Sequence, residues 1–227
     1  MSNLDFSSIL ASSIHDMKNS LGMVLSSLDD IVDVESNSCA CTPEMVAQLQ
    51  YEAKRVNDNL VQLLTMYKLD NKYYSVNLSE LDLADFLEES YLLNKPLLDH
   101  KNIQADIVCE SDDFGYFDRD LMAGVINNLV TNAARYSKQC ISLNAAFEDG
   151  YLCLSVEDDG PGFPERMLNT DFEGDDALDM VSGHTKLGLF FCTMVARLHN
   201  VGGRQGFIKL DNHSRLGGGC FTIHLPQ

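Results

Sequence analysis

Hydrophobic residues near the start of the chain recur at alternating steps of four and three residues. This spacing places them along one side of an α-helix, and a run of this length is typical of a helix that packs against another helix. We therefore predict a long helix over residues 6 to 33. Its apolar seam consists of Leu10, Ile14, Met17, Leu21, Val24, Leu28 and Ile31.

A second helix is predicted to follow a polar loop that ends in Thr42 and Pro43. Thr42 can cap the helix, and the fixed backbone angle of Pro43 suits its first turn. The apolar pattern then continues to about residue 70. Its seam consists of Met45, Leu49, Ala53, Val56, Leu60, Leu63 and Tyr67.

Together the two helices predict an N-terminal αα hairpin over residues 1–72. The hairpin cannot bury all of its apolar surface, because some apolar residues face away from the partner helix. Pairing two hairpins into a four-helix bundle would cover them, so we expect a homodimer. Packing of the hairpin on its own C-terminal domain is the alternative. The outward residues are Ile9, Leu25, Val46 and Leu64.

The pattern changes after the polar residues Asn71 and Lys72, and residues 73–227 predict a second domain large enough to hold its own core. Helical periodicity and strand-like alternation are mixed in this domain, with turn signals between the strands. We expect an antiparallel sheet backed by helices, which is an α+β fold. The expected helices cover 81–98, 118–136 and 187–199, and the strands 104–109, 140–147, 151–157, 207–210 and 220–225.

The charge balance argues against nucleic acid and anionic membranes as partners. The chain of 227 residues has 34 acidic and 16 basic residues, for a formal net charge of −18. Such a surface repels phosphate backbones and anionic lipids. We see neither a signal peptide nor an apolar run long enough to span a membrane, so we expect a cytoplasmic protein without membrane insertion. The seven cysteines lack the paired spacing of a zinc site and are expected to be reduced thiols.

One histidine has neighbours that suit phosphoryl chemistry. His15 falls one residue beyond the apolar seam, and Asn19 lies one turn further along the same exposed face. A neutral imidazole can attack a phosphorus atom if its other nitrogen carries the proton and is held in place. Asp16 can accept that proton's hydrogen bond at Nδ1 and leave Nε2 as the nucleophile. A solvated histidine without a role is the alternative for this residue alone.

Two later segments combine polar side chains in ways that suit a nucleotide. Asn128 and Asn132 lie one turn apart on a predicted helix, beside Arg135, and amide oxygens there suit Mg²⁺ and its phosphates. Asp158 ends a predicted strand just before Gly160 and Gly162. A carboxylate in that place can accept from the exocyclic amine of adenine, and glycines let the backbone approach a flat base. A solvated amide face and an ordinary turn are the alternatives.

In this order and spacing, the segments resemble the sensor histidine kinases of two-component signalling, from about residue 8 to Pro226. The resemblance implies a hairpin that forms a dimeric four-helix bundle, followed by a GHKL (Bergerat-type) α/β sandwich. It implies that His15 accepts the phosphoryl group, that Asp16 is its acidic neighbour, and that Asn19 assists hydrolysis of the partner's phosphoaspartate. The implied nucleotide residues are Asn128, Asn132 as the Mg²⁺ ligand, Arg135, Tyr136 beside adenine, Asp158, Gly160, Gly162, Lys186 and Gly188.

The chain departs from that family at the third glycine box. The family reads Gly-x-Gly-Leu-Gly-Leu, whereas residues 184–189 here read His-Thr-Lys-Leu-Gly-Leu. Two glycines that expose backbone N–H groups to phosphates are replaced, and Lys186 can compensate as a point charge. The acidic segment between Gly162 and His184 also lacks the family's Phe-x-x-Phe sequence.

Three functions follow as hypotheses. The first is a cytoplasmic histidine kinase that transfers the γ-phosphoryl group of Mg-ATP to His15 and then to an aspartate in the receiver domain of a response regulator. The second is an ATP-independent histidine phosphotransferase or regulator phosphatase with a degenerate pocket, which the altered glycine box favours. The third is a helical scaffold or a GHKL ATPase acting on a protein partner, which leaves His15 unexplained. Because we recognise no sensor or receiver domain, we expect input from a separate sensor protein or an upstream phosphodonor.

Overall fold

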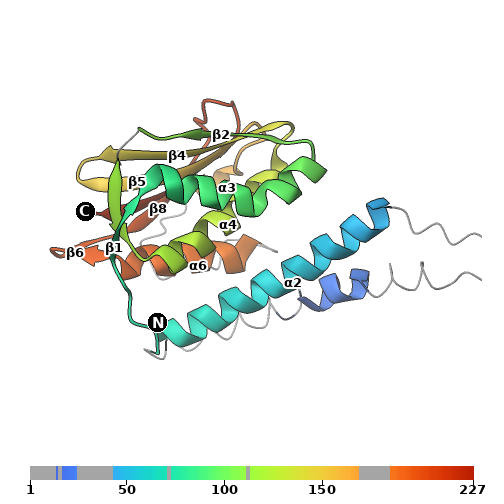
Figure 1. Cartoon of the computed structure of the whole chain (residues 1–227), viewed down its shortest axis with the longest axis horizontal. Coiled ribbons are helices and arrows are strands. Elements are labelled where there is room, and N and C mark those ends of the chain that lie inside the picture. Colours follow the sequence, from blue (N-terminus) through green and yellow to red (C-terminus); the bar gives the residue numbers. More distant parts are fainter. Residues whose placement is uncertain (1–13, 15–16, 25–42, 71–72, 111–112, 169–184) are drawn as a thin grey trace, which may run out of the picture. The chain divides into compact units, whose positions relative to one another are not determined.

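The structure is a computed structural model (Figure 1). The chain forms two compact units, residues 1–73 and 74–227. No helix in the described part of the chain is long and apolar enough to cross a membrane. The structure describes residues 14, 17–24, 43–70, 73–110, 113–168 and 185–227.

The first unit contains a helical segment over residues 17–24 and helix α2 (Pro43–Asp70). Burial follows the predicted seam only in part. Leu63 of α2 is buried, but Leu60 and Tyr67 on α2 and Leu21 on the first segment are about half exposed. Two paired helices can bury only the narrow stripe between them. Leu21, Leu60 and Tyr67 are therefore not buried as the predicted seam required.

A polar cluster joins the two helical segments of the first unit. Arg55 on α2 donates a hydrogen bond to the hydroxyl of Ser20, which is fully buried. Arg55 also forms an ion pair of 3.3 Å with Glu52, one turn earlier on the same helix. Because a buried polar group is satisfied in few arrangements, the cluster favours a single register between the two segments.

The second unit is built on a five-stranded sheet in the order β2-β4-β5-β9-β8. All neighbouring strands pair antiparallel except β2 and β4, which are parallel. The expectation of an antiparallel sheet was therefore wrong, and the sheet is mixed. Parallel neighbours need a crossover, which the chain between them provides. The strands are β2 (Gln104–Val108), β4 (Cys140–Glu148), β5 (Tyr151–Asp158), β8 (Phe207–Asp211) and β9 (Cys220–Pro226).

The longer helices of this unit lie on the same face of the sheet (Figure 1). They are α3 (Leu83–His100), α4 (Arg119–Tyr136) and α6 (Thr185–Leu198), close to the predicted helical ranges. Their apolar sides meet alternate residues of the strands, which is the layer arrangement of an α+β fold. Fully buried core residues include Leu83, Leu87, Met122, Ile126, Leu143, Leu152, Leu154 and Ile223.

Short elements that the sequence did not predict complete the unit. Strand β1 (Ser79–Asp82) pairs antiparallel with β3 (Phe114–Phe117). The predicted helix started two residues too early there, because Asp82 is the last residue of β1 and caps α3 by accepting from the backbone N–H of Asp85 at 2.9 Å. The other short elements are α5 (Glu165–Leu168), β6 (Asn200–Val201) and β7 (Arg204–Gln205).

The first residues of the second unit are tied to the start of α4. Asp118 caps this helix by accepting from the backbone N–H of Leu121 at 3.1 Å. The same carboxylate accepts from the hydroxyl of Tyr74 at 3.0 Å and from the backbone N–H of Asn77 at 2.8 Å. One buried side chain therefore fixes both the N-terminus of α4 and the segment that leads into the unit.

Candidate functional site

A cavity of about 280 Å³ lies between α4, α6 and the ends of β5, β8 and β9. Its volume is close to the lower end for small-molecule sites, and its lining is mainly apolar. Such a cavity suits a flat apolar ligand that has a few polar groups at its edge. The lining residues are Leu129, Asn132, Ala133, Tyr136, Val156, Asp158, Pro161, Gly162, Phe163, Pro164, Arg166, Met167, Leu189, Leu210 and Phe221.

Asp158 is the one carboxylate among the described residues that line the cavity. Its Oδ1 accepts from the backbone N–H groups of Gly160 at 2.7 Å and of Gly219 at 3.2 Å. Among the described residues, Oδ2 accepts no hydrogen bond. Burial raises the pKa of Asp158, and the two N–H donors offset only part of that rise. The side chain is thus held rigidly, with one oxygen available to a donor on a ligand.

The two glycines after Asp158 have different structural roles. A Cβ on Gly160 would lie 2.5 Å from the backbone carbonyl oxygen of Tyr136, so Gly160 is required by close packing within the protein. Gly162 lines the cavity and has φ of 77°, in the left-handed region that favours glycine. Substitution of Gly162 would therefore strain the loop at the edge of the cavity.

The two asparagines of α4 face different surroundings. Asn132 lines the cavity, together with the half-exposed Tyr136 one turn later. Asn128 is buried outside the lining, and its Nδ2 donates to Sγ of Cys192 on α6 at 3.3 Å. Gly188 packs directly on the amide of Asn128, where a Cβ would collide with it. The remaining glycine of the third box thus lets the start of α6 approach α4.

The remaining predicted site residues either fall outside the described part of the chain or do not line the cavity. His15 and Asp16 are outside the described residues, and so is the side chain of Lys186. Asn19 is described and exposed on its helix. Arg135 is described but does not line the cavity. The structure therefore brings together Asn132, Tyr136, Asp158 and Gly162, and it places Asn128 and Gly188 in the adjacent layer.

Sequence reasoning missed several residues of the cavity. Phe163 and Arg166 line it, and Arg166 is the one cation in the described part of the lining. The sequence feature that could have indicated Arg166 is Pro164, because a proline often precedes the first turn of a helix and Arg166 lies in the short helix that follows it. Gly219 also belongs to the site, because its backbone N–H donates to Oδ1 of Asp158.

Part of the second unit matches a known family model. Residues 117–227 match the family model of the histidine kinase-, DNA gyrase B- and HSP90-like ATPases. The sensor protein SrrB of Staphylococcus aureus, strain N315, is 27% identical over 226 residues, which are 96% of this chain and 37% of SrrB. SrrB of strain NCTC 8325 matches to the same extent. The chain thus spans about 37% of the length of these curated relatives.

Solved structures of histidine kinases share the fold. The Acinetobacter baumannii histidine kinase AdeS aligns with a TM-score of 0.67 and 20% identity, over 93% of this chain and 97% of AdeS. The catalytic domain of histidine kinase ThkA aligns with a TM-score of 0.54 and 24% identity, over 66% of this chain and 95% of that domain. The cytoplasmic segment of histidine kinase QseC has a TM-score of 0.53 and 17% identity, over 75% of this chain and 95% of the segment.

Proposed function

Because the chain is homologous to sensor histidine kinases and residues 117–227 belong to the histidine kinase-, DNA gyrase B- and HSP90-like ATPases, we propose that it is a protein-histidine kinase of a two-component system. It transfers the γ-phosphoryl group of ATP to Nε2 of His15, with release of ADP. It then passes the group to an aspartate in the receiver domain of a response regulator. The observation that carries the proposal is the cavity in which Asn132, Tyr136 and Asp158 meet.

The cavity is suited to the adenine ring. The Oδ2 atom of Asp158 can accept from an exocyclic amine, while the apolar side chains of Leu210 and Phe221 cover a flat base. Guanine would place a carbonyl oxygen opposite the carboxylate, where two acceptors repel each other. We therefore expect ATP to be preferred over GTP.

Asn132 is the residue that we assign to Mg²⁺. No group of three His, Cys, Asp or Glu side chains able to hold a metal is present among the described residues. A magnesium ion keeps several waters and shares the nucleotide phosphates, so one amide oxygen at the cavity suffices. Bound there, it supplies positive charge against the phosphate oxygens. Arg135 and Lys186 are the proposed phosphate-side cations.

The phosphoacceptor helix completes the proposal. Asp16 would orient His15 by accepting from Nδ1–H, which leaves Nε2 to attack phosphorus. Asn19, which is exposed, would assist hydrolysis of the regulator's phosphoaspartate. The exposed apolar side chains of the first unit support a homodimer. The free thiols of the second unit support a cytoplasmic location.

Labelling with ATP tests the kinase assignment. The wild type, His15→Ala, Asn132→Ala and the control His213→Ala, which alters an exposed residue, are incubated with γ-labelled ATP and Mg²⁺. We expect acid-labile label on the wild type and on His213→Ala. His15→Ala should bind ATP and stay unlabelled, while Asn132→Ala should fold and lose labelling. Label on His15→Ala contradicts the phosphoacceptor assignment, and label on Asn132→Ala contradicts the Mg²⁺ assignment.

A second candidate function rests on the third glycine box. Its first half is His-Thr-Lys, and its remaining glycine, Gly188, is packed against Asn128. A phosphate loop of this composition favours a phosphotransferase or a regulator phosphatase that does not use ATP. That function predicts no label from ATP, together with transfer of phosphate between His15 and a phosphorylated receiver domain.

A further inference from the structure

The side chain of Asn212, on the loop between β8 and β9, forms two hydrogen bonds at the edge of the cavity. The Oδ1 atom of Asn212 accepts from the backbone N–H of Phe163 at 2.6 Å, and its Nδ2 donates to the carbonyl oxygen of Phe163 at 2.9 Å. A single amide thus pairs with both polar backbone atoms of a residue 49 positions earlier in the chain. Phe163 itself lines the cavity.

The segment that Asn212 holds is the rim of the cavity, residues 161–164, all of which line it. The side-chain amide of Asn212 occupies the space beside Gly162 that a Cβ would need. A Cβ on Gly162, which has a left-handed backbone, would lie 2.6 Å from Oδ1 of Asn212. The absence of a side chain on Gly162 therefore lets Asn212 lie close to the rim backbone.

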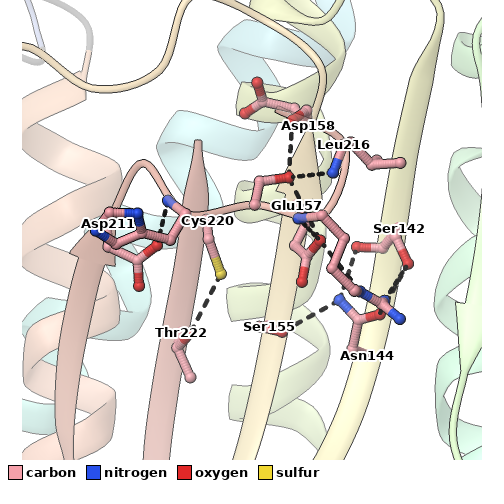
Figure 2. A network of polar contacts seen from close by, with 12 residues as sticks. Ser142, Asn144, Ser155, Glu157, Asp158, Asp211, Leu216, Cys220 and Thr222 are labelled. Atoms are coloured by element: carbon pink, nitrogen blue, oxygen red, sulfur yellow. Dashed lines mark hydrogen bonds and ion pairs between the residues drawn. The ribbon is translucent and has the colours of Figure 1, made fainter. Parts of the chain in front are cut away.

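The loop that carries Asn212 is fastened at its other end to β5. Ser214 donates from its hydroxyl to the carbonyl oxygen of Asp158 at 3.1 Å, and the backbone N–H of Arg215 donates to Oε2 of Glu157 at 3.0 Å. The side chain of Arg215 donates to Ser142 and Asn144 on β4. Figure 2 shows Glu157 and Asp158 at the end of β5, with Ser142 and Asn144 on the neighbouring strand. The same loop provides the N–H of Gly219 that holds Asp158.

We infer that Asn212 is a positioning residue that sets the separation between the rim and Asp158. The loop is tied to the strand that ends in Asp158, and Asn212 extends from it to Phe163, so the two sides of the cavity are held by one short segment. The inference rests on the proposed function for the identity of the ligand, an adenine nucleotide. A rim that is already in place spares a ligand the cost of ordering it.

Two substitutions separate hydrogen bonding from side-chain size. Asn212→Ala removes both hydrogen bonds, and Asn212→Asp keeps the shape but turns an oxygen toward the carbonyl of Phe163. Since two hydrogen bonds to the rim are lost or opposed, we expect the Kd for ATP to rise about tenfold in both variants. The KM for ATP should rise by the same factor while kcat at saturating ATP is unchanged. His213→Ala, at the adjacent exposed residue, should leave both constants unchanged.

Hydrogen exchange at the backbone amide of Phe163 tests, without any ligand, whether Asn212 holds the rim of the cavity in place. The amide should exchange faster in both Asn212 variants than in the wild type and in His213→Ala. Unchanged exchange overturns the inference, and so does faster exchange with unchanged ATP affinity in a protein that binds ATP. If the wild type binds no ATP, the proposed kinase function fails, and the exchange rates alone decide whether Asn212 holds the rim.

Discussion

At the scale of single residues, the neighbouring carboxylates of Asp158 and Asp159 have different surroundings, and their pKa values shift in opposite directions. Asp158 is buried against the cavity, and its pKa is raised by burial. Asp159 accepts from the backbone N–H groups of Lys138 at 2.7 Å and of Gln139 at 3.0 Å. Burial acts to raise the pKa of Asp159, but these backbone donors outweigh it and hold the pKa below its usual range. Asp158 thus faces the cavity, while Asp159 holds the turn that leads into β4.

Substitution of each aspartate by asparagine should distinguish a contribution to ATP affinity from a contribution to stability. Asp158→Asn replaces an acceptor with a group that can donate, so we expect ATP affinity to fall more than tenfold with little change in stability. Asp159→Asn weakens charge-assisted bonds to the backbone and should cost about 1–2 kcal/mol of unfolding free energy with ATP affinity retained. Calorimetric titration with ATP and urea unfolding measure the two quantities. An Asp158→Asn protein with wild-type affinity would contradict the assignment of the base contact.

At the scale of elements, a histidine joins the end of α6 to the start of α4. His199 is almost fully buried, and its Nε2 accepts from the backbone N–H of Asp118 at 3.0 Å. Its Nδ1 lies 2.8 Å from the carbonyl oxygen of Val195 and donates to it. This pairing requires the neutral ring, since a proton on Nε2 would face the N–H of Asp118. Burial lowers the pKa of His199, despite the opposing effects of Val195 and Asp118.

This arrangement predicts an acid-sensitive second unit. Below the ordinary histidine pKa of 6.5, the unfolded chain takes up a proton that folded His199 resists. Stability should therefore fall as the pH drops from 6.5 towards the lower folded-state pKa, and level off below that value. His224, whose pKa burial also lowers, contributes in the same direction. Urea unfolding between pH 7 and 5 should show a smaller pH dependence in His199→Gln and, separately, in His224→Gln. Identical slopes in His199→Gln and the wild type would refute the role of His199.

The sequence predicted elements whose signal is local, and it missed features that depend on distant contacts. The amphipathic pattern of α4 and the alternation of β5 specified those elements and, with them, Asn132 and Asp158. The parallel pairing of β2 with β4 depends on where the crossover places a strand, which no local pattern encodes. Asn212 was missed for the same reason, because its partner Phe163 becomes a neighbour only once β8 lies beside β9.

At the scale of the whole molecule, several large apolar side chains on the described helices of the first unit are exposed. Ile14 and Leu21 on the first helical segment are 55% and 51% exposed. On α2, Leu60, Leu64 and Tyr67 are 57%, 51% and 49% exposed. In a symmetric dimer each such residue is buried twice, once in each protomer. We therefore expect dimerisation to depend on this surface.

A charge on this surface should separate the protomers. Burial of a leucine contributes about 1.5–3 kcal/mol, and Leu64→Glu removes it from both protomers, so we expect the dimer Kd to rise by at least about a hundredfold. Leu93→Glu, on α3 of the other unit, is the matched control because Leu93 is 59% exposed. Sedimentation equilibrium measures the change. A Leu64→Glu protein that remains as dimeric as the control would contradict this interface.

The carboxylate of Asp118, which caps α4, links this helix to the first residues of the second unit. Tyr74 and Asn77 cannot move away from Asp118 without breaking hydrogen bonds or shifting the helix that Asp118 caps. Asn132 lies 14 residues further along that helix, a rise of about 21 Å at 1.5 Å per residue. A displacement of residues 74–77 would therefore be expected to act on the start of α4 through Asp118, and α4 is the helix that carries Asn132 to the cavity.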